Sequence, residues 1–415
     1  MRVLIVSQYF WPESFRINEV AESLVAAGCK VTVLTGQPNY PGGKTLAGYR
    51  ALGAGKDPSL RPYDLFRVPL IPRGRGRAGG LIANYLSFIV FASLFGPWLL
   101  RDRRFDIIFV YGVSPIFQAI PAILLKWLKR APLVLWVQDL WPESLEVTGY
   151  VKNRTLLGVA ADLVGWIYKR CDLILGQSRS FVEAITPMAG QVPVDFFPTP
   201  GDVAIPATEV PALALPAGFN IVFAGNIGTA QALPTILKAA IALKHRTDIR
   251  FVLVGDGSQR DWLVSEVATE GLDNVSMPGR FPSTAIPGIL SQASALLVTL
   301  NRSDAMARTI PAKISTYMAA GKPIIAAIDG EGGKAVSEAG AGLACPAEDA
   351  TALVDAISRL VDMSAAEREQ MGRAGRAYYN DNFEPDMLTG RLIAFFLQAI
   401  AAGQRPAGRG APRDL

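Results

Sequence analysis

Two acidic side chains, one helical turn apart, stand where acid–base chemistry could occur. Asp139 and Glu143 follow the apolar run 133–137, which has the length and composition of a buried strand. If a turn of helix follows, both carboxylates share one face, and Pro142 is compatible with that turn. Either carboxylate could orient or deprotonate a substrate hydroxyl. We favour Asp139, and the alternative is that Asp139 caps the turn after the strand.

A glycine-containing turn and nearby side chains could bind phosphate. The segment Gly225-Asn-Ile-Gly228 lies between an apolar run and a predicted helix. Backbone N–H groups at such a turn can cradle phosphate oxygens, and Asn226 and Gln231 could add neutral donors. Lys313 and Arg308 would supply positive charge, which stabilises charge developing on a departing phosphate. The alternative is an ordinary strand-to-helix turn without a ligand.

Alternating strands and helices must position these residues. In the first half, apolar runs predict strands at 2–6, 30–35, 106–110, 133–137 and 173–176. In the second half, they predict strands at 220–223, 251–254, 275–277, 295–299 and 323–327. Helical patterns lie between the strands, for example at 17–27, 233–244 and 261–270. The sequence therefore predicts an α/β protein with two doubly wound sheets, which bind ligands beyond the carboxyl ends of their strands.

The proline-rich stretch from Pro198 to Pro216 separates the two patterns and is interpreted as a linker. We accordingly expect an N-terminal domain at 1–200 and a C-terminal domain at 217–381. Residues 382–402 are expected to form a C-terminal helix that crosses back to the N-terminal domain. The tail 403–415 is rich in Gly, Pro, Ala and Arg and is expected to be disordered.

Short motifs in both halves resemble glycosyltransferase family 4. The second half carries Phe223-Ala-Gly-Asn-Ile-Gly228, Leu253-Val-Gly-Asp-Gly257, Pro278-Gly-Arg-Phe281, Pro311-Ala-Lys-Ile314 and Tyr317-Met-Ala-Ala-Gly-Lys-Pro323. The first half carries Gln8-Tyr-Phe-Trp-Pro-Glu13 and Trp136-Val-Gln-Asp-Leu-Trp-Pro-Glu143. The last two are similar to the subgroup that builds bacterial surface polysaccharides, including fucosyl and fucosaminyl transferases of the colanic-acid and O-antigen type. The resemblance covers about residues 1–400.

This resemblance implies a GT-B fold, with two Rossmann-like domains facing across a cleft. It implies a retaining transferase, of the hexosyltransferase or N-acetylhexosaminyltransferase type. The donor would be a nucleotide-sugar, with UDP favoured over GDP. The nucleotide-sugar is a co-substrate, and neither a cofactor nor a metal is expected.

The resemblance, together with position in the chain, assigns residues to the two substrates. Lys313 joins Asp139 and Glu143 as a catalytic residue. Glu13 and Arg16 lie in the first loop after the first predicted strand, where the cleft is expected, and by this position they are candidates for binding the acceptor. The donor-binding residues are Gly225, Asn226, Gly228, Gln231, Gly255, Arg280, Phe281, Arg308, Thr316 and Glu331.

The chain departs from the family pattern at several donor and catalytic positions. Gln138 precedes Asp139 where the family often has histidine. The basic pair that holds the donor diphosphate falls on Asn226 and Gln231, and two glutamates fall on Arg308 and Thr316.

The charge distribution favours an anionic partner for the first half. Residues 1–200 hold 22 Lys+Arg against 14 Asp+Glu, a net +8, which leaves 19 against 22, a net −3, for residues 201–415. The uncharged stretch 79–100 is flanked by arginines on both sides. It could lie on a membrane, span it, or form a core helix.

Together these features predict a peripheral or monotopic protein at the cytoplasmic face of the inner membrane. Its acceptor would be a polyprenyl-diphosphate-linked saccharide. Three cysteines without a metal or disulfide spacing agree with a reducing compartment, and no nucleic-acid recognition motif occurs.

Two other functions remain open. One is a nucleotide-sugar epimerase with the same fold, and the other is a catalytically silent sugar-nucleotide-binding subunit of a polysaccharide assembly complex. His245, the sole histidine, lies at a predicted helix end and is interpreted as an exposed capping residue. A serine–histidine hydrolase or a histidine-based metal site is therefore not favoured.

Overall fold

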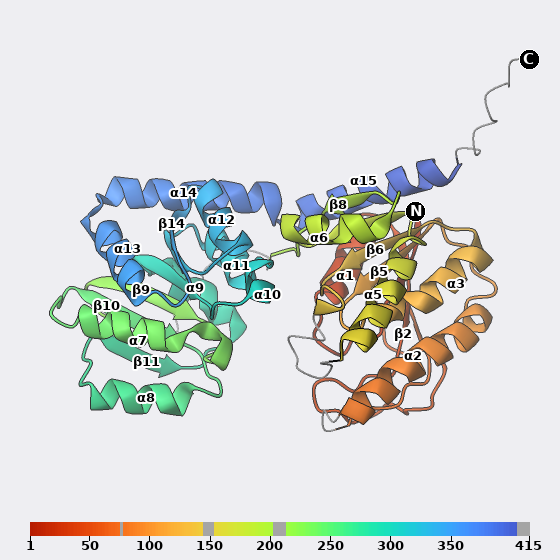
Figure 1. Cartoon of the computed structure of the whole chain (residues 1–415), viewed down its shortest axis with the longest axis horizontal. Helices are drawn as coiled ribbons and strands as arrows, with labels where there is room; N and C mark the ends of the chain where they lie inside the picture. Colours follow the sequence, from red (N-terminus) through yellow and green to blue (C-terminus); the bar gives the residue numbers. More distant parts are fainter. Residues whose placement is uncertain (75–77, 144–152, 202–212, 405–415) are drawn as a thin grey trace, which may run out of the picture. The chain divides into compact units, whose positions relative to one another are not determined.

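The computed structural model describes residues 1–74, 78–143, 153–201 and 213–404, and it divides into two compact units (Figure 1). Unit 1 comprises Met1–Pro198 and Leu388–Leu415, and unit 2 comprises Thr199–Met387. The expected linker core at 202–212 and most of the expected tail, 405–415, lie outside the described residues.

Unit 1 is built on an eight-stranded sheet with the order β3-β4-β2-β1-β5-β6-β7-β8. All neighbouring strands are parallel except β3 and β4. The strands are β1 (Arg2–Val6), β2 (Lys30–Thr35), β3 (Gly55–Lys56), β4 (Asp64–Arg67), β5 (Ile107–Gly112), β6 (Leu133–Val137), β7 (Leu173–Gly176) and β8 (Val194–Phe196).

Helices cover both faces of this sheet, which is why its central strands are apolar at almost every position. The helices are α1 (Ile17–Ala26), α2 (Ala78–Leu99), η1 (Ile116–Gln118), α3 (Ala119–Lys129), α5 (Arg154–Tyr168), α6 (Arg179–Ala189) and α15 (Pro385–Gln404). On one face, Ile108 and Val110 of β5 share a core with α2, α3, α5 and α6. On the other, Phe109 packs edge-on against Phe396 of α15 at 5.2 Å.

Unit 2 contains a six-stranded parallel sheet with the order β11-β10-β9-β12-β13-β14. The strands are β9 (Phe219–Ala224), β10 (Ile249–Val254), β11 (Val275–Gly279), β12 (Ala295–Thr299), β13 (Ile324–Ala327) and β14 (Gly342–Cys345). The helices are η2 (Thr229–Gln231), α7 (Leu233–Ala242), α8 (Arg260–Thr269), η3 (Ser283–Ala285), α9 (Ile286–Ser291), α10 (Asp304–Ala307), α11 (Ala312–Ala320), α12 (Glu331–Glu338), α13 (Ala350–Asp362) and α14 (Ala365–Asn382). Two separate cores lie on the two faces of the sheet.

The predicted class, α/β with two doubly wound sheets, is confirmed. The strands predicted at 2–6, 30–35, 133–137, 173–176 and 295–299 have the same bounds in the structure. The sequence analysis missed β3, β4, β8 and β14, which are two to four residues long. The strands β3 and β8 are too short to show a period, and charged or small residues interrupt the apolar runs of β4 and β14.

The uncharged stretch 79–100 forms α2, whose inner side belongs to the core of unit 1. Leu81, Phe88 and Ala92 are buried there, and Asn84 is buried beside them. In the described part of the chain, two helical segments, Gly79–Leu99 and Ala365–Gly403, are long and apolar enough to cross a membrane, by length and composition only. Because α2 supplies part of the core, the spanning alternative would require that core to come apart.

Candidate active site

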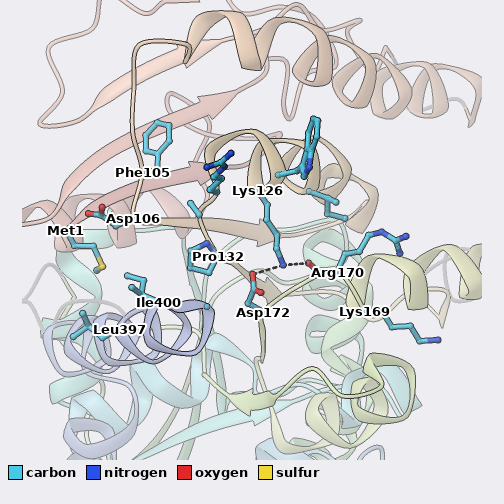
Figure 2. Close-up of a pocket in the computed structure, with 15 residues that line it drawn as sticks. Met1, Phe105, Asp106, Lys126, Pro132, Lys169, Arg170, Asp172, Leu397 and Ile400 are labelled. Carbon is cyan, nitrogen blue, oxygen red and sulfur yellow. Dashed lines mark hydrogen bonds and ion pairs between the residues drawn. The ribbon is translucent and has the colours of Figure 1, made fainter. Parts of the chain in front are cut away.

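A pocket of about 1020 Å³ lies at the amino ends of the strands in unit 1 (Figure 2). Its wall includes Asp106 beside β5 and Asp172 beside β7, together with Lys126 of α3. Lys126 donates to Asp172, with Nζ and Oδ2 2.7 Å apart. None of the predicted site residues lines this pocket. Several of those residues, among them Asp139, Gly225 and Arg280, instead follow the carboxyl ends of strands, where parallel sheets bind ligands.

In unit 2, two glycine turns meet where β9 and β10 end. The Gly225 N–H donates to Val254 O at 2.9 Å, and the Gly255 N–H donates to Gly279 O at 2.8 Å. Both Gly225 and Gly255 have φ near +140°, which favours glycine. A Cβ on Gly255 would lie 1.8 Å from the Gly225 carbonyl oxygen. The close approach of the two turns therefore requires glycine at position 255.

Lys313 reaches this turn from the first turn of α11. A Cβ on Gly225 would lie 2.7 Å from Lys313 Cε, so the lysine stem crosses directly over the glycine. Its Nζ donates to Gln231 Oε1 and lies 3.6 Å from the centroid of the Phe223 ring. Burial lowers the pKa of Lys313 to about 7. Within the described residues Lys313 makes no ion pair, so its ammonium group lacks a counter-ion.

Asn301 and Thr299 hold the turn that carries Gln231. The Asn301 backbone N–H and Nδ2 donate to the carbonyls of Ala230 and Thr229, each at 2.9 Å. Its Oδ1 accepts the N–H just before α7 at 3.0 Å, and Thr299 Oγ1 donates to Gln231 O at 2.5 Å. The sequence analysis missed Asn301 and Thr299 as site residues. The sequence did offer a signal for them, because both are polar residues at the carboxyl end of the predicted strand 295–299 or just after it.

Two backbone N–H groups of the turn Gly225–Gly228 already donate hydrogen bonds within the protein. The N–H groups of Gly225 and Ile227 donate to carbonyl oxygens at and just after the end of β10, both at 2.9 Å. Among the described residues, the N–H groups of Asn226 and Gly228 have no recorded partner. Because alternate N–H groups join the strands, those of Asn226 and Gly228 are the ones left to cradle a phosphate within the described part of this turn, and phosphate binding here stays a prediction.

Arg308 and Glu331 come from backbone segments that touch. Arg308 is the C-cap of α10, and Gly330, with φ +74°, packs against the preceding Ala307. A Cβ on Gly330 would lie 1.9 Å from the Ala307 carbonyl oxygen. Glu331 was expected in a flexible loop, but it is the first residue of α12 and is only 7% exposed. A carboxylate is favoured there by the positive end of the helix dipole.

The remaining predicted donor residues have varied surroundings. Arg280 and Phe281 directly follow β11; Arg280 is exposed, and Phe281 packs against the adjacent core. Thr316 Oγ1 donates to Ala312 O at 3.1 Å, one turn earlier in α11. The hydroxyl of Thr316 is therefore used within its own helix, as is common for threonine. Their donor-binding roles stay predictions.

In unit 1, Asp139 joins the ends of two neighbouring strands. Its Oδ2 accepts the Ser114 N–H, which follows β5, at 2.8 Å. The Ser114 hydroxyl in turn accepts the Trp141 Nε1–H at 3.0 Å. Glu143 has a different neighbour, because its charge helps to raise the pKa of the buried Tyr168, after burial itself and Cys171. The structure therefore gives the two acids separate surroundings, and residues 144–152 beyond them are outside the described residues.

The carboxylate of Glu13 holds the loop at Asn39 and Tyr40 through hydrogen bonds. Glu13 is 4% exposed, and its Oε1 accepts the N–H groups of Asn39 and Tyr40, both at 2.7 Å. Its Oε2 accepts the Phe10 N–H at 3.3 Å. Burial raises the pKa of Glu13, although these hydrogen bonds act in the opposite direction. Arg16, at the start of α1, forms an ion pair with Glu19 at 2.7 Å. Contact of Glu13 and Arg16 with an acceptor stays a prediction.

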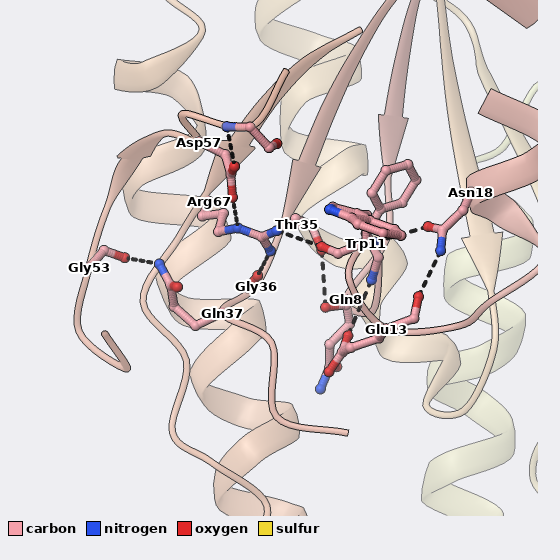
Figure 3. Close-up of polar contacts among 12 residues, drawn as sticks. Gln8, Trp11, Glu13, Asn18, Thr35, Gly36, Gln37, Gly53, Asp57 and Arg67 are labelled. Atoms are coloured by element: carbon pink, nitrogen blue, oxygen red, sulfur yellow. Dashed lines mark hydrogen bonds and ion pairs between the residues drawn. The ribbon is translucent and has the colours of Figure 1, made fainter. Parts of the chain in front are cut away.

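A buried ion pair, which the sequence analysis missed, fixes the same loops (Figure 3). The Arg67 guanidinium donates to Asp57, to Gly36 O at 3.0 Å and to Trp11 O at 2.5 Å. The side chains of Arg67 and Asp57 are 4% and 2% exposed. Burial alone would raise the pKa of Asp57, but hydrogen bonds from Ser59 and Arg67 outweigh it and hold the pKa below its ordinary value. The available signal was an arginine within an apolar strand-like run.

Metal ligands are not gathered anywhere in the part of the chain that the structure describes. Within residues 1–74, 78–143, 153–201 and 213–404, no group of three or more His, Cys, Asp or Glu side chains could hold an ion.

Comparison with known proteins identifies both halves. Residues 14–199 match the glycosyl transferase 4-like domain, and residues 218–363 match the glycosyl transferases group 1. The chain is 24% identical to the glycosyltransferase WbjE of Pseudomonas aeruginosa over 77% of this chain and 80% of that protein. It is 28% identical to the colanic acid biosynthesis glycosyl transferase WcaI of Escherichia coli K12 over 77% and 82%.

Solved structures of other proteins share the fold of this chain. The crystal structure of Anabaena HepE (Alr3699) in complex with UDP superposes with a TM-score of 0.67 at 14% identity, covering 96% of this chain and all of HepE. At this identity the likeness concerns the fold. With both domain models matched in order, the chain belongs to glycosyltransferase family 4 and is a glycosyltransferase of the GT-B fold.

Proposed function

We propose that this enzyme transfers a sugar, with retention of configuration, from a nucleotide-sugar to a polyprenyl-diphosphate-linked saccharide. The donor is a UDP-sugar in preference to a GDP-sugar, and the product enters a bacterial surface polysaccharide. The reaction takes place at the cytoplasmic face of the inner membrane. WcaI acts in colanic acid biosynthesis, as its name states, and this supports the polysaccharide assignment.

The observation that carries the donor assignment is the ammonium group of Lys313, which Gln231 Oε1 holds and which has no counter-ion among the described residues. When the bond to the anomeric carbon breaks, negative charge grows on the departing diphosphate. A preorganised cation in a partly dehydrated site stabilises that charge more strongly than water can. Lys313 Nζ already stands beside the turn 225–231, held by Gln231 Oε1. The N–H groups of Asn226 and Gly228, which have no partner in the described part of the chain, would add hydrogen bonds to the same group.

Lys313 also accounts for the departure of this chain from the family pattern. The basic pair expected in the turn is replaced by Asn226 and Gln231. The structure brings a cation to that turn from α11, 82 residues later in the chain. We infer that Lys313 binds the diphosphate in their place. The HepE complex contains UDP, which supports a uridine nucleotide for this chain as well. No metal is required in this scheme.

On the acceptor side, Asp139 is the proposed acid–base group. It lies just beyond the carboxyl end of β6, and within the described part of the chain it accepts one hydrogen bond, from Ser114. Its second carboxylate oxygen can therefore accept a hydrogen bond from the acceptor hydroxyl and orient it for attack. Glu13 and the pair Arg67–Asp57 would act as positioning residues, since they hold the loops around this edge.

The test is a turnover assay on the purified protein. We would supply a panel of UDP- and GDP-sugars, with and without a polyprenyl-diphosphate-linked saccharide, and measure released nucleoside diphosphate and product by mass spectrometry. Acceptor-dependent release with one donor is expected, and it should be lost in Lys313→Met and Asp139→Ala. The configuration of the new bond follows from product NMR.

Other outcomes would favour the competing functions. Conversion of a donor without any acceptor would indicate an epimerase. Tight binding of a donor without turnover, across acceptors that homologous transferases use, would indicate a silent subunit. Product with inverted configuration would contradict the retaining mechanism while leaving the transferase assignment intact.

A further inference from the structure

Helix α2 is apolar on every side, although only one side is packed within unit 1. Its 22 residues, Ala78–Leu99, include no charged side chain. Phe88 and Ala92 are fully buried on the inner side, and α3 packs alongside. A surface helix of a water-soluble domain normally presents a polar face to solvent, whereas a helix that is apolar all round is normally buried on all sides. The outer side of α2 has the composition of a buried surface.

Five large side chains, spaced four residues apart, form a continuous ridge on that outer side. We call this the α2 ridge; its members are Ile82, Leu86, Val90, Leu94 and Trp98, which are 57%, 56%, 50%, 66% and 58% exposed. Residues four apart lie above one another on a helix surface. A contiguous exposed apolar patch of this kind marks an interaction surface.

Cations and tryptophans at one end of the ridge indicate that its partner is a lipid bilayer. Trp98 is followed by Arg101 and Arg104, both exposed. The neighbouring α3 ends in the same way, with Trp127, which is 76% exposed, and then the exposed Arg130. Tryptophan and basic side chains favour the headgroup level of a membrane, where the ring is half-dehydrated and the cation meets lipid phosphate.

Hydrogen bonds tie α2 to the loops of the candidate active site. Asn84, buried on the inner side, donates through Nδ2 to Ile71 O at 2.6 Å and accepts from Gln8 Nε2 at 2.7 Å. Gln8 belongs to the loop after β1, close to Glu13. These bonds and the core contacts hold α2 in the domain, so a membrane can reach only its outer side.

We propose that α2 lies parallel to an anionic bilayer and inserts the α2 ridge into the boundary between headgroups and acyl chains, with Arg101, Arg104 and Arg130 on lipid phosphates. Interfacial helices of this kind bury their apolar face about 5–10 Å deep. This inference rests on the proposed function, which already includes a membrane partner. It adds that the α2 ridge is the surface that binds the membrane.

The test is vesicle flotation with the full chain. Vesicles of three parts phosphatidylcholine to one part phosphatidylglycerol should carry the protein, and pure phosphatidylcholine should carry less. Leu86→Glu and Leu94→Glu should each lower the partition coefficient by about tenfold or more, because a charge cannot enter the acyl region. Both positions are exposed, so the variants should melt like the wild type. Val264→Glu, at a 41% exposed position on α8 of unit 2, is the matched control and should float normally.

Two results would overturn the proposal. Ridge variants that float like the wild type would show that another surface binds lipid. A lipid-free dimer, seen by light scattering and dissociated by Leu94→Glu, would show that a second copy covers the ridge. The ridge variants should retain transfer to a short-chain acceptor analogue in solution and lose it on vesicle-embedded acceptor. Failure of the wild type on both acceptors would instead count against the proposed function.

Discussion

The charge state of Lys313 should make donor binding depend on pH. Burial lowers its pKa from 10.5 to about 7, which corresponds to about 5 kcal/mol of unfavourable free energy for the charged form. A bound diphosphate compensates for that loss and raises the pKa, so donor binding takes up a proton. Affinity is then highest below the free pKa of about 7 and falls as the pH rises towards the bound pKa.

The expected size of the effect follows from the fraction of protonated lysine. With a pKa of about 7, that fraction falls from roughly a quarter at pH 7.5 to about one hundredth at pH 9. The Kd for UDP should therefore rise about 20-fold over this interval. The phosphate groups of UDP stay ionised throughout it, because a phosphate monoester has a second pKa of about 6.

Isothermal titration calorimetry in buffers of different ionisation enthalpy would measure both the affinity and the proton uptake. Lys313→Met should bind UDP about 20-fold more weakly or worse at pH 7.5, since it removes a charge-assisted hydrogen bond, and its affinity should not vary up to pH 9. Lys313→Arg should also be insensitive to pH because arginine stays charged. Lys238→Met, at an exposed lysine on α7, is the control and should match the wild type. An equal Kd for the wild type at pH 7.5 and pH 9 would refute the reasoning.

Four other variants test residues of the candidate active site and of the buried ion pair. Gly225→Ala places a Cβ 2.7 Å from Lys313 Cε and should weaken UDP binding by about tenfold, measured by calorimetry, with unchanged circular dichroism. Arg67→Met leaves a buried carboxylate unpaired and should lower the free energy of unfolding by about 3–5 kcal/mol in urea titrations. Because the pKa of Asp57 is lowered, its contribution to stability is present above its ordinary pKa of 3.8 and is lost as the pH falls through the folded value. Asp57→Asn should therefore flatten the stability profile below about pH 4, and an unchanged profile would contradict this role. Asp139→Ala should reduce acceptor-dependent turnover by about 10²–10⁴-fold without altering the Kd for UDP.

Local sequence patterns were sufficient for most of the sheet framework. Strands such as 133–137 and 295–299 are short apolar runs between turn residues, and burial on both faces requires such runs. The glycines of the turns after β9 and β10 were also recognisable, since Gly225 and Gly255 adopt φ values near +140°, which strongly favour glycine. The strands β3 and β8 were missed because two or three residues show no period, and β4 and β14 because charged or small residues interrupt their apolar runs.

The surroundings of individual side chains were harder to predict from the sequence than the helices and strands. Glu331 was expected in a loop, because its glycine-rich neighbours suggest flexibility, yet contacts with α10 place it at the start of a helix. The spacing of Asp139 and Glu143 allowed them to share a face if a turn followed the strand, but it could not show that Asp139 binds Ser114 and that Glu143 lies near Tyr168. Spacing along the chain cannot specify partners that other elements supply.

The sequence by itself determined most of the elements, the two doubly wound sheets that they build and the edges at which ligands should bind, because these depend on local periodicity and turn residues. The tertiary structure alone decided which groups meet there. Lys313 and Gln231 are 82 residues apart, and the low pKa of Lys313 exists only where packing removes water from it. In α2 the sequence is apolar on every side, so no pattern could show which side is buried. Only the packing of that helix on unit 1 leaves the α2 ridge exposed.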